Sequence, residues 1–191
     1  MSSDHHVTYG AADFDTATLI GRAFPDAALL DVNGAPTTFA QTVAGRSAVV
    51  AFYRGAWCPF CNIALREYQS SLVGPLGRTN TALLAISPQK PDGSMTLTEK
   101  DELTFDVMSD PGNSIARALG IVAPQSAERT AARLERGLDL TEVNADGTTD
   151  LVHPTAIVVD ASGVIRWIDV HPDYSTRSAP ADILAAVNAL P

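Results

Sequence analysis

The chain has 191 residues, of which 46% are hydrophobic and 18% are charged, a balance typical of a folded globular protein and not of a disordered one. Its formal net charge of −9 argues against binding to nucleic acid or to an anionic membrane surface. No apolar run reaches transmembrane length and the polar N-terminus has no signal-peptide pattern, so we expect a cytoplasmic protein.

In chain order, a polar extension over residues 1–19 precedes a single predicted domain over residues 20–191. Asn33-Gly34 predicts a hairpin turn between the first two strands. The expected strands cover residues 27–31, 36–38, 47–53, 81–87, 103–108, 156–160 and 164–169. The expected helices cover residues 39–44, 59–71, 92–102, 110–119, 127–137 and 180–190.

This order of elements predicts an α/β fold. Strands 47–53 and 81–87 are apolar without alternation, which indicates burial on both faces. We therefore expect a central mixed β-sheet flanked by helices, with an N-terminal β-hairpin extension. Residues 124–150 do not fit the pattern and predict an insertion. A lid over the active site, a dimer contact and surface decoration are the alternatives for it, and surface decoration is the simplest.

The only two cysteines of the chain, Cys58 and Cys61, form a C-x-x-C motif shortly after strand 47–53. Cys58 falls at the N-cap of the predicted helix, and Pro59 takes the first helical position, where its missing N–H costs nothing. The amides of the first turn and the positive end of the helix favour a thiolate on Cys58. We therefore predict that Cys58 is the more acidic and more exposed thiol, and that oxidation joins both in an intramolecular disulfide.

Two other interpretations of the motif are weaker. A structural zinc site needs about four Cys or His ligands. The histidines show no metal-binding spacing; they are His5, His6, His153 and His171. A static disulfide that closes so short a loop gains little chain entropy. Two cysteines in a single motif suit a reducing cytosol. No glycine-rich phosphate loop is present, and we expect neither a metal nor a cofactor.

Several segments together resemble one protein superfamily. They are Phe24–Asp26, Asp31–Gly34, Phe52–Cys61, Asp110–Asn113 and Pro154–Asp160. With these segments the sequence resembles the thioredoxin-fold superfamily. More closely, it resembles the AhpC/TSA (alkyl hydroperoxide reductase/thiol-specific antioxidant) family, in its peroxiredoxin-like branch, from about residue 20 to the C-terminus.

The resemblance implies two catalytic patterns. In thioredoxin-like reductases the first cysteine attacks, the second resolves and a cis-proline faces them, a pattern that Cys58, Cys61 and Pro154 match. We therefore predict that the His153–Pro154 bond is cis, lies near Cys58, and leaves backbone free to pair with substrate. In peroxiredoxins the peroxide-attacking cysteine corresponds to Cys61. In this alignment Arg54 stands where the family has its proline, and Cys58 stands where it has its threonine. The family's arginine falls near Pro154, where this chain has no arginine.

The predicted function is a thiol-dependent oxidoreductase that cycles Cys58 and Cys61 between dithiol and disulfide and reduces disulfides or oxidised thiols. One alternative is an antioxidant hydroperoxide reductase with Cys61 peroxidatic and Cys58 resolving. Another is a non-catalytic binding domain on the same fold. Thioredoxin or a low-molecular-weight thiol is the expected reductant, a disulfide or a hydroperoxide the expected substrate, and a homodimer is compatible with the sequence.

Residues beside the motif are candidates for supporting roles. Arg54 is placed to stabilise a thiolate or to bind an anionic substrate, although a solvated arginine is the simpler interpretation. Trp57 and Phe60 are expected to form an apolar rim around the sulfurs, or else to pack in the core. His153 is a candidate for tuning the thiolate or for moving a proton, since its pKa lies near neutrality, although a solvated loop histidine is simpler.

Overall fold

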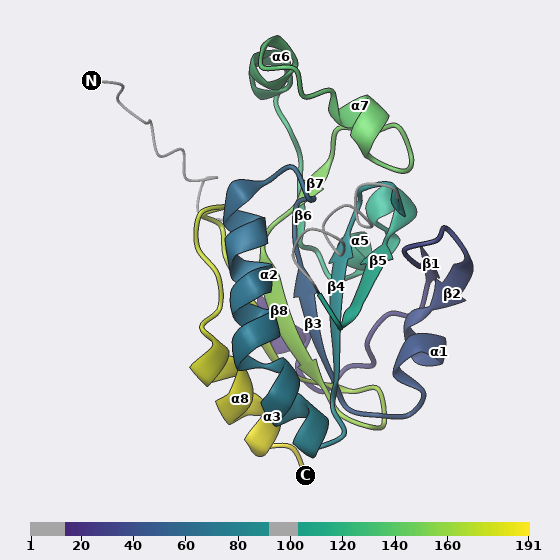
Figure 1. The fold of residues 1–191 in the computed structure, drawn as a ribbon, viewed down its shortest axis with the longest axis vertical. Coiled ribbons are helices and arrows are strands. Elements are labelled where there is room, and N and C mark those ends of the chain that lie inside the picture. The colour runs from purple at the N-terminus through teal and green to yellow at the C-terminus, as the bar shows by residue number, and fades with distance from the viewer. Residues whose placement is uncertain (1–13, 92–102) are drawn as a thin grey trace.

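The computed structural model describes residues 14–91 and 103–191, and its central feature is a mixed sheet of seven strands in the order β2-β1-β5-β4-β3-β8-β9 (Figure 1). β3 pairs in parallel with β4, and β4 with β5, whereas the other neighbours are antiparallel. The strands are β1 (Ala28–Leu30), β2 (Pro36–Thr38), β3 (Ala48–Phe52), β4 (Ala82–Ser87), β5 (Asp106–Ser109), β8 (Thr155–Val159) and β9 (Ile165–Val170).

Helices cover both faces of this sheet. Along β3, Val49 and Ala51 face the apolar cluster that includes α2, α3 and α8, while Val50 and Phe52 face the cluster that includes α1 and α5. Burial on both faces explains why this strand has no polar alternation. The helices are η1 (Thr16–Thr18), α1 (Phe39–Val43), α2 (Pro59–Ser71), α3 (Val73–Arg78), η2 (Pro111–Asn113), α5 (Ser114–Ala118), α6 (Ala127–Glu135), α7 (Leu140–Val143) and α8 (Pro180–Asn188).

The insertion predicted over residues 124–150 forms a separate projection. Its base is a small antiparallel sheet of β6 (Val122–Ala123) and β7 (Leu151–Val152). Its helices α6 and α7 extend beyond the end of the main sheet, at the end where α2 begins (Figure 1). Backbone hydrogen bonds between residues 88–90 and residues 143–145 tie the projection to the chain that leaves β4.

Most of the predicted elements are present. The mixed sheet, its flanking helices and the N-terminal hairpin β1–β2 are confirmed. The helix expected over residues 92–102 lies outside the described residues. The strand expected over residues 103–108 is displaced toward its C-terminal end, at Asp106–Ser109. Among the described residues α3, α7 and the β6–β7 pair were not predicted, since they are short and have no regular apolar period.

In the described part of the chain, no helix is both long and apolar enough to cross a lipid bilayer. The division between an extension over residues 1–19 and a domain over residues 20–191 stays a prediction. Leu19, on the extension side of that boundary, packs against the main core cluster.

Candidate active site

A tight turn between β3 and α2 brings the cysteine motif to the end of the sheet. The Ala56 amide donates to the side-chain oxygen of Gln89, and the Asn62 side chain donates to the Ala56 carbonyl at 2.9 Å. Gly55 has a φ of +142°, and a Cβ atom there would lie 2.4 Å from Nε1 of Trp57 and 2.7 Å from Oε1 of Gln89. Only glycine fits this position without displacing its neighbours.

Cys58 is the N-cap of α2, as predicted, and Pro59 occupies the first turn. The Cys58 carbonyl accepts hydrogen bonds from the amides of Cys61 and Asn62, each at 3.1 Å. The Cys58 sulfur accepts a hydrogen bond from the side chain of Cys61. Both cysteines are free thiols in this structure.

The two thiols have opposite pKa shifts. A hydrogen bond from Cys61 lowers the pKa of Cys58 to about 6, and the positive charges of Arg54 and Arg177 add to this effect against the opposing effect of burial. Burial raises the pKa of Cys61 well above its usual range, and the adjacent Cys58 raises it further. At neutral pH Cys58 is therefore mainly a thiolate and Cys61 a thiol, the direction predicted from the helix start.

Exposure does not separate the two thiols as predicted, since the exposed fraction is 1% for Cys58 and 0% for Cys61. The two cysteines differ in the size of the pocket that each one lines. Cys58 lines a pocket of about 510 Å³, whereas Cys61 lines a much smaller cavity of about 10 Å³. A reagent of more than a few atoms therefore reaches the sulfur of Cys58 first.

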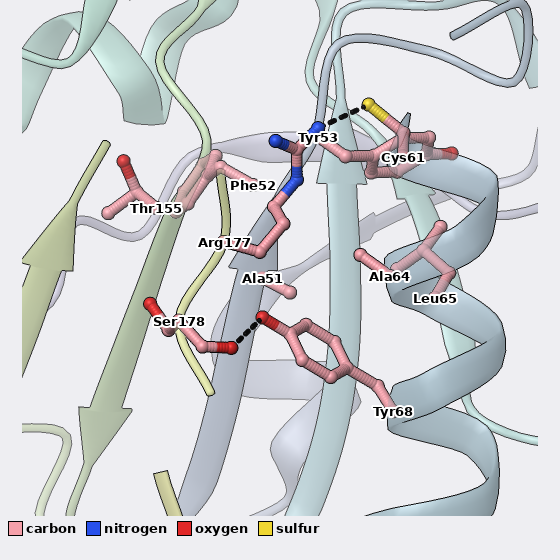
Figure 2. A pocket seen from close by; sticks show the side chains of 10 residues that line it. All are labelled: Ala51, Phe52, Tyr53, Cys61, Ala64, Leu65, Tyr68, Thr155, Arg177 and Ser178. Carbon is pink, nitrogen blue, oxygen red and sulfur yellow. Dashed lines mark hydrogen bonds between the residues drawn. The ribbon is translucent and has the colours of Figure 1, made fainter. Parts of the chain in front are cut away.

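The guanidinium of Arg177 reaches Cys61 from the segment between β9 and α8 (Figure 2). Its Nη2 lies 2.9 Å from Sγ of Cys61, at hydrogen-bond distance. The neighbouring Ser178 is held from both sides, because its carbonyl accepts from the Tyr68 hydroxyl at 2.8 Å and its hydroxyl donates to Asp169 at 2.7 Å. These hydrogen bonds fix the backbone next to Arg177 and so help to position its guanidinium beside Cys61.

Sequence reasoning missed Arg177. The family pattern led us to look for an arginine near Pro154, where the chain has none. Arg177 supplies a guanidinium beside Cys61 from a different element, 116 residues further along the chain. No motif marks it, since it is a single arginine in a polar loop.

Arg54 is buried, contrary to the simpler expectation of a solvated arginine, with an exposed fraction of 4%. Its guanidinium carbon lies 5.0 Å from the centre of the Trp57 ring and 4.6 Å from that of Tyr174. These cation–π contacts hold the charge beside Cys58. Phe60 is 42% exposed and meets Tyr174 edge to face at 5.9 Å, so it contributes to the predicted apolar rim.

His153 and Pro154 differ from the predictions. The described residues contain no cis peptide bond, so the predicted cis state of His153–Pro154 is wrong. Pro154 directly precedes β8, and its carbonyl accepts a hydrogen bond from the His171 amide at 2.8 Å. His153 is buried rather than solvated, with its ring 4.9 Å from that of Phe14, and burial lowers the pKa of its imidazole.

No metal-binding cluster of three or more His, Cys, Asp or Glu side chains occurs within residues 14–91 and 103–191. The chemistry that the described residues support is that of the two sulfurs and the cations around them.

The structure thus places a thiol of lowered pKa next to a second thiol, at the start of a helix that packs on the mixed sheet of an α/β scaffold. Dithiol redox chemistry requires such a pair. A family model described as the AhpC/TSA family matches residues 20–168. The chain therefore belongs to the AhpC/TSA family.

Individual relatives agree with this assignment. Two Mycobacterium tuberculosis proteins from different strains, provisionally described as peroxiredoxins, are each 30% identical over 100 residues. The match spans 52% of this chain and 62% of theirs, so it covers less than two thirds of the relatives' length.

Solved structures confirm that the fold is thioredoxin-like. The peroxidoxin BcpB of M. tuberculosis superposes with a TM-score of 0.69 at 17% identity, covering 90% of this chain and 97% of that one. A cysteine-to-serine mutant of peroxiredoxin 6 from Arenicola marina gives 0.71 at 14% identity, covering 89% of this chain and 72% of that one.

Proposed function

We propose that the protein is a thiol-dependent reductase in which Cys58 attacks the oxidised substrate and Cys61 resolves the product. The observation that carries this proposal is the opposite pKa shift of the two thiols. The thiolate is the nucleophile in thiol redox chemistry, and a pKa of about 6 makes Cys58 a thiolate at neutral pH.

With a hydroperoxide, the Cys58 thiolate attacks the terminal oxygen and the O–O bond breaks. Cys58 becomes a sulfenic acid, and the alkoxide or hydroxide leaves and takes up a proton from water. The Cys61 sulfur then attacks the Cys58 sulfur, forming a disulfide. Water leaves, made from the sulfenic hydroxyl and the Cys61 proton. Two equivalents of an external thiol restore the dithiol.

With a disulfide, the same thiolate forms a mixed disulfide on Cys58 and releases the first thiolate. Cys61 then attacks the Cys58 sulfur and releases the second thiol. The family relatives favour a hydroperoxide as the oxidant. Disulfide exchange is the second candidate, because the acidic N-cap cysteine, Cys58, can also attack a disulfide.

Thioredoxin or a low-molecular-weight thiol is the proposed reductant. A cytoplasmic location accords with two free thiols that must be kept reduced between turnovers. The peroxiredoxin-type polarity, with Cys61 peroxidatic, is disfavoured because the pKa of Cys61 is raised and this thiol keeps its proton at neutral pH.

Stopped-flow oxidation of the reduced protein tests the proposal. Wild type, Cys58→Ser and Cys61→Ser are each mixed with hydrogen peroxide and with insulin disulfide. We expect Cys58→Ser to lose the first step with both oxidants. We expect Cys61→Ser to keep the first step and to accumulate a sulfenic acid or mixed disulfide on Cys58. A fast first step in Cys58→Ser would reverse the roles, and no reaction in any form would favour a non-catalytic binding domain.

A further inference from the structure

One face of helix α6 lies over the pocket that contains Cys58. Arg129, Ala132, Arg133 and Arg136 follow the spacing i, i+3, i+4, i+7, which places them on one side of a helix. All four line the pocket of about 510 Å³ that Cys58 also lines. The insertion is therefore not surface decoration, since its first helix forms one wall of the space before the reactive sulfur.

The charge of this pocket is opposite to the charge of the protein. The chain as a whole carries a formal charge of −9. The described residues that line the pocket include four arginines and no aspartate or glutamate. The arginines are Arg54, Arg129 and Arg133 on α6, and Arg136 directly after α6. The acidic residues of the same helix, Glu128 and Glu135, are not among the lining residues. A negatively charged protein thus gathers four arginine side chains around one pocket, beside Cys58.

The pocket also has an aromatic side, formed by Trp57, Phe60 and Tyr174. Arg54 is stacked between two of these rings, which fixes a guanidinium against an apolar surface. A ligand that fits both sides has an apolar body and a separate anionic group. Hydrogen peroxide has neither.

We propose that this pocket selects a small substrate that bears a carboxylate on an apolar body, and that the arginines of α6 orient it with its S–S or O–O bond toward Cys58. The proposal rests on the proposed function and names the substrate class for the same site. Backbone hydrogen bonds between residues 143–145 and residues 88–90 hold the insertion in place. The pocket is therefore held together before the ligand arrives.

The physical consequence is a charge-dependent rate. A cleft lined by one sign of charge raises the local concentration of oppositely charged ligands and their association rates by ~10- to 1,000-fold at low salt. The advantage falls as salt screens the charges. The same substrate without its carboxylate loses this advantage but still meets the thiolate of Cys58.

The experiment compares two aromatic disulfides, dithiobis(nitrobenzoate), which carries carboxylates, and dithiodipyridine, which is uncharged. The rate constant for Cys58 is measured with each at pH 7.5, a pH chosen because it lies ~1.5 units above the thiolate pKa. The variants are Arg133→Gln, Arg136→Gln and the double variant. Arg78→Gln is the matched control, since it removes the same charge from the exposed end of α3, far from α6 (Figure 1).

We expect the ratio of the anionic to the neutral rate constant to fall by about 10-fold in the double variant and to be unchanged in Arg78→Gln. Added sodium chloride should lower the ratio in wild type more than in the double variant. An equal ratio in wild type and the double variant would overturn the inference. If Cys58 fails to react with the neutral disulfide as well, the proposed function itself is wrong.

Two further pairs of reagents test whether the carboxylate-bearing ligand is the oxidant or the reducing thiol. Linoleate hydroperoxide is compared with its methyl ester as oxidant, and mercaptopropionate with mercaptoethanol as reductant. A charge preference that the double variant loses in the first pair assigns the pocket to the oxidant. A preference found only in the second pair would overturn the proposal, because a reducing thiol has no S–S or O–O bond to direct at Cys58. A double variant that matches wild type in both pairs contradicts the proposal.

Discussion

Nη2 of Arg177 lies 2.9 Å from Sγ of Cys61, although the two residues are 116 positions apart in the chain. Figure 2 shows the guanidinium directed at the sulfur from the segment that follows β9. Cys61 holds its proton because it is buried, while the charge of Arg177 lowers the pKa of both Cys61 and Cys58. Arg177 therefore favours the negative charge that Cys61 must acquire when it attacks the oxidised Cys58.

Replacement of Arg177 by Gln should slow the resolving step more than the first step. A charge-assisted hydrogen bond is lost at the sulfur of Cys61, and we expect the conversion of oxidised Cys58 to the disulfide to slow by about 10-fold or more. Stopped-flow traces with a second oxidation phase measure this directly. Arg177→Lys should recover part of the rate, because it restores the charge without the planar guanidinium. An unchanged second phase in Arg177→Gln would show that the contact has no role in resolution.

The rate of the first oxidation step should rise with pH as the Cys58 thiol loses its proton. Because a hydrogen bond from Cys61 is the main cause that lowers the pKa of Cys58 to about 6, the first step should reach half its maximum near that pH. Cys61→Ala removes the donor and should raise the pKa of Cys58, whereas Cys61→Ser keeps a hydroxyl donor and should raise it less. Thiolate absorbance at 240 nm gives both values. A lower pKa in Cys61→Ala than in wild type would contradict the assignment.

The stability of the reduced protein should rise with pH between 6 and 8. The pKa of Cys58 is about 6 in the folded state, and a free cysteine titrates near 8.5, so in this range the unfolded chain binds more protons. The thiolate therefore contributes stability that is lost as the pH falls through 6. The slope is at most ~1.4 kcal/mol per pH unit. Urea denaturation of wild type and Cys58→Ser over this range measures it, and parallel curves for the two proteins would exclude the linkage.

Gly55→Ala should destabilise the protein and disturb the site. The new Cβ atom would lie 2.4 Å from Nε1 of Trp57, at a φ of +142°. Strain of this kind costs about 1–3 kcal/mol. Gly77→Ala is the control, because it lies in α3 with no atom within 4 Å of its Cβ position. That substitution should be neutral or stabilising by up to ~1 kcal/mol. Equal melting temperatures for the two variants would contradict this account of the turn.

Peroxide treatment of the protein should yield an intramolecular Cys58–Cys61 disulfide. Both sulfurs lie in the first turn of α2, close enough for a hydrogen bond between them. Mass spectrometry of proteolytic peptides, with and without reductant, identifies the bond. Dimers joined through cysteine as the main product would refute the expectation.

Much of the scaffold was predictable because it depends on local patterns. The apolar runs that became β3 and β4 could be buried only inside a covered sheet, and Asn33-Gly34 could only be a turn. The N-cap position of Cys58 followed from the proline after it, and that position alone indicated which thiol is acidic. These features depend on residues within one or two turns of each other.

The remainder of the site depends on residues distant in sequence. Tyr174 stacks on Arg54, and Arg177 bonds to Cys61, because the segment after β9 returns to the start of α2. Similarly, the insertion that carries α6 is held by the β6–β7 pair at its base and by backbone hydrogen bonds to residues 88–90, and α6 lines the pocket of Cys58.

The sequence by itself determined the fold class, the placement of both cysteines at a helix start and the direction in which the pKa of Cys58 shifts, because Cys61, the hydrogen-bond donor that lowers this pKa most, lies within one turn of Cys58. Only the tertiary structure decided which cations surround the sulfurs, that the His153–Pro154 bond is not cis, and that Arg129, Arg133 and Arg136 line the same pocket as Cys58. The physical reason is that a charge far along the chain acts on a thiol only when the packed sheet brings both into the same low-dielectric space.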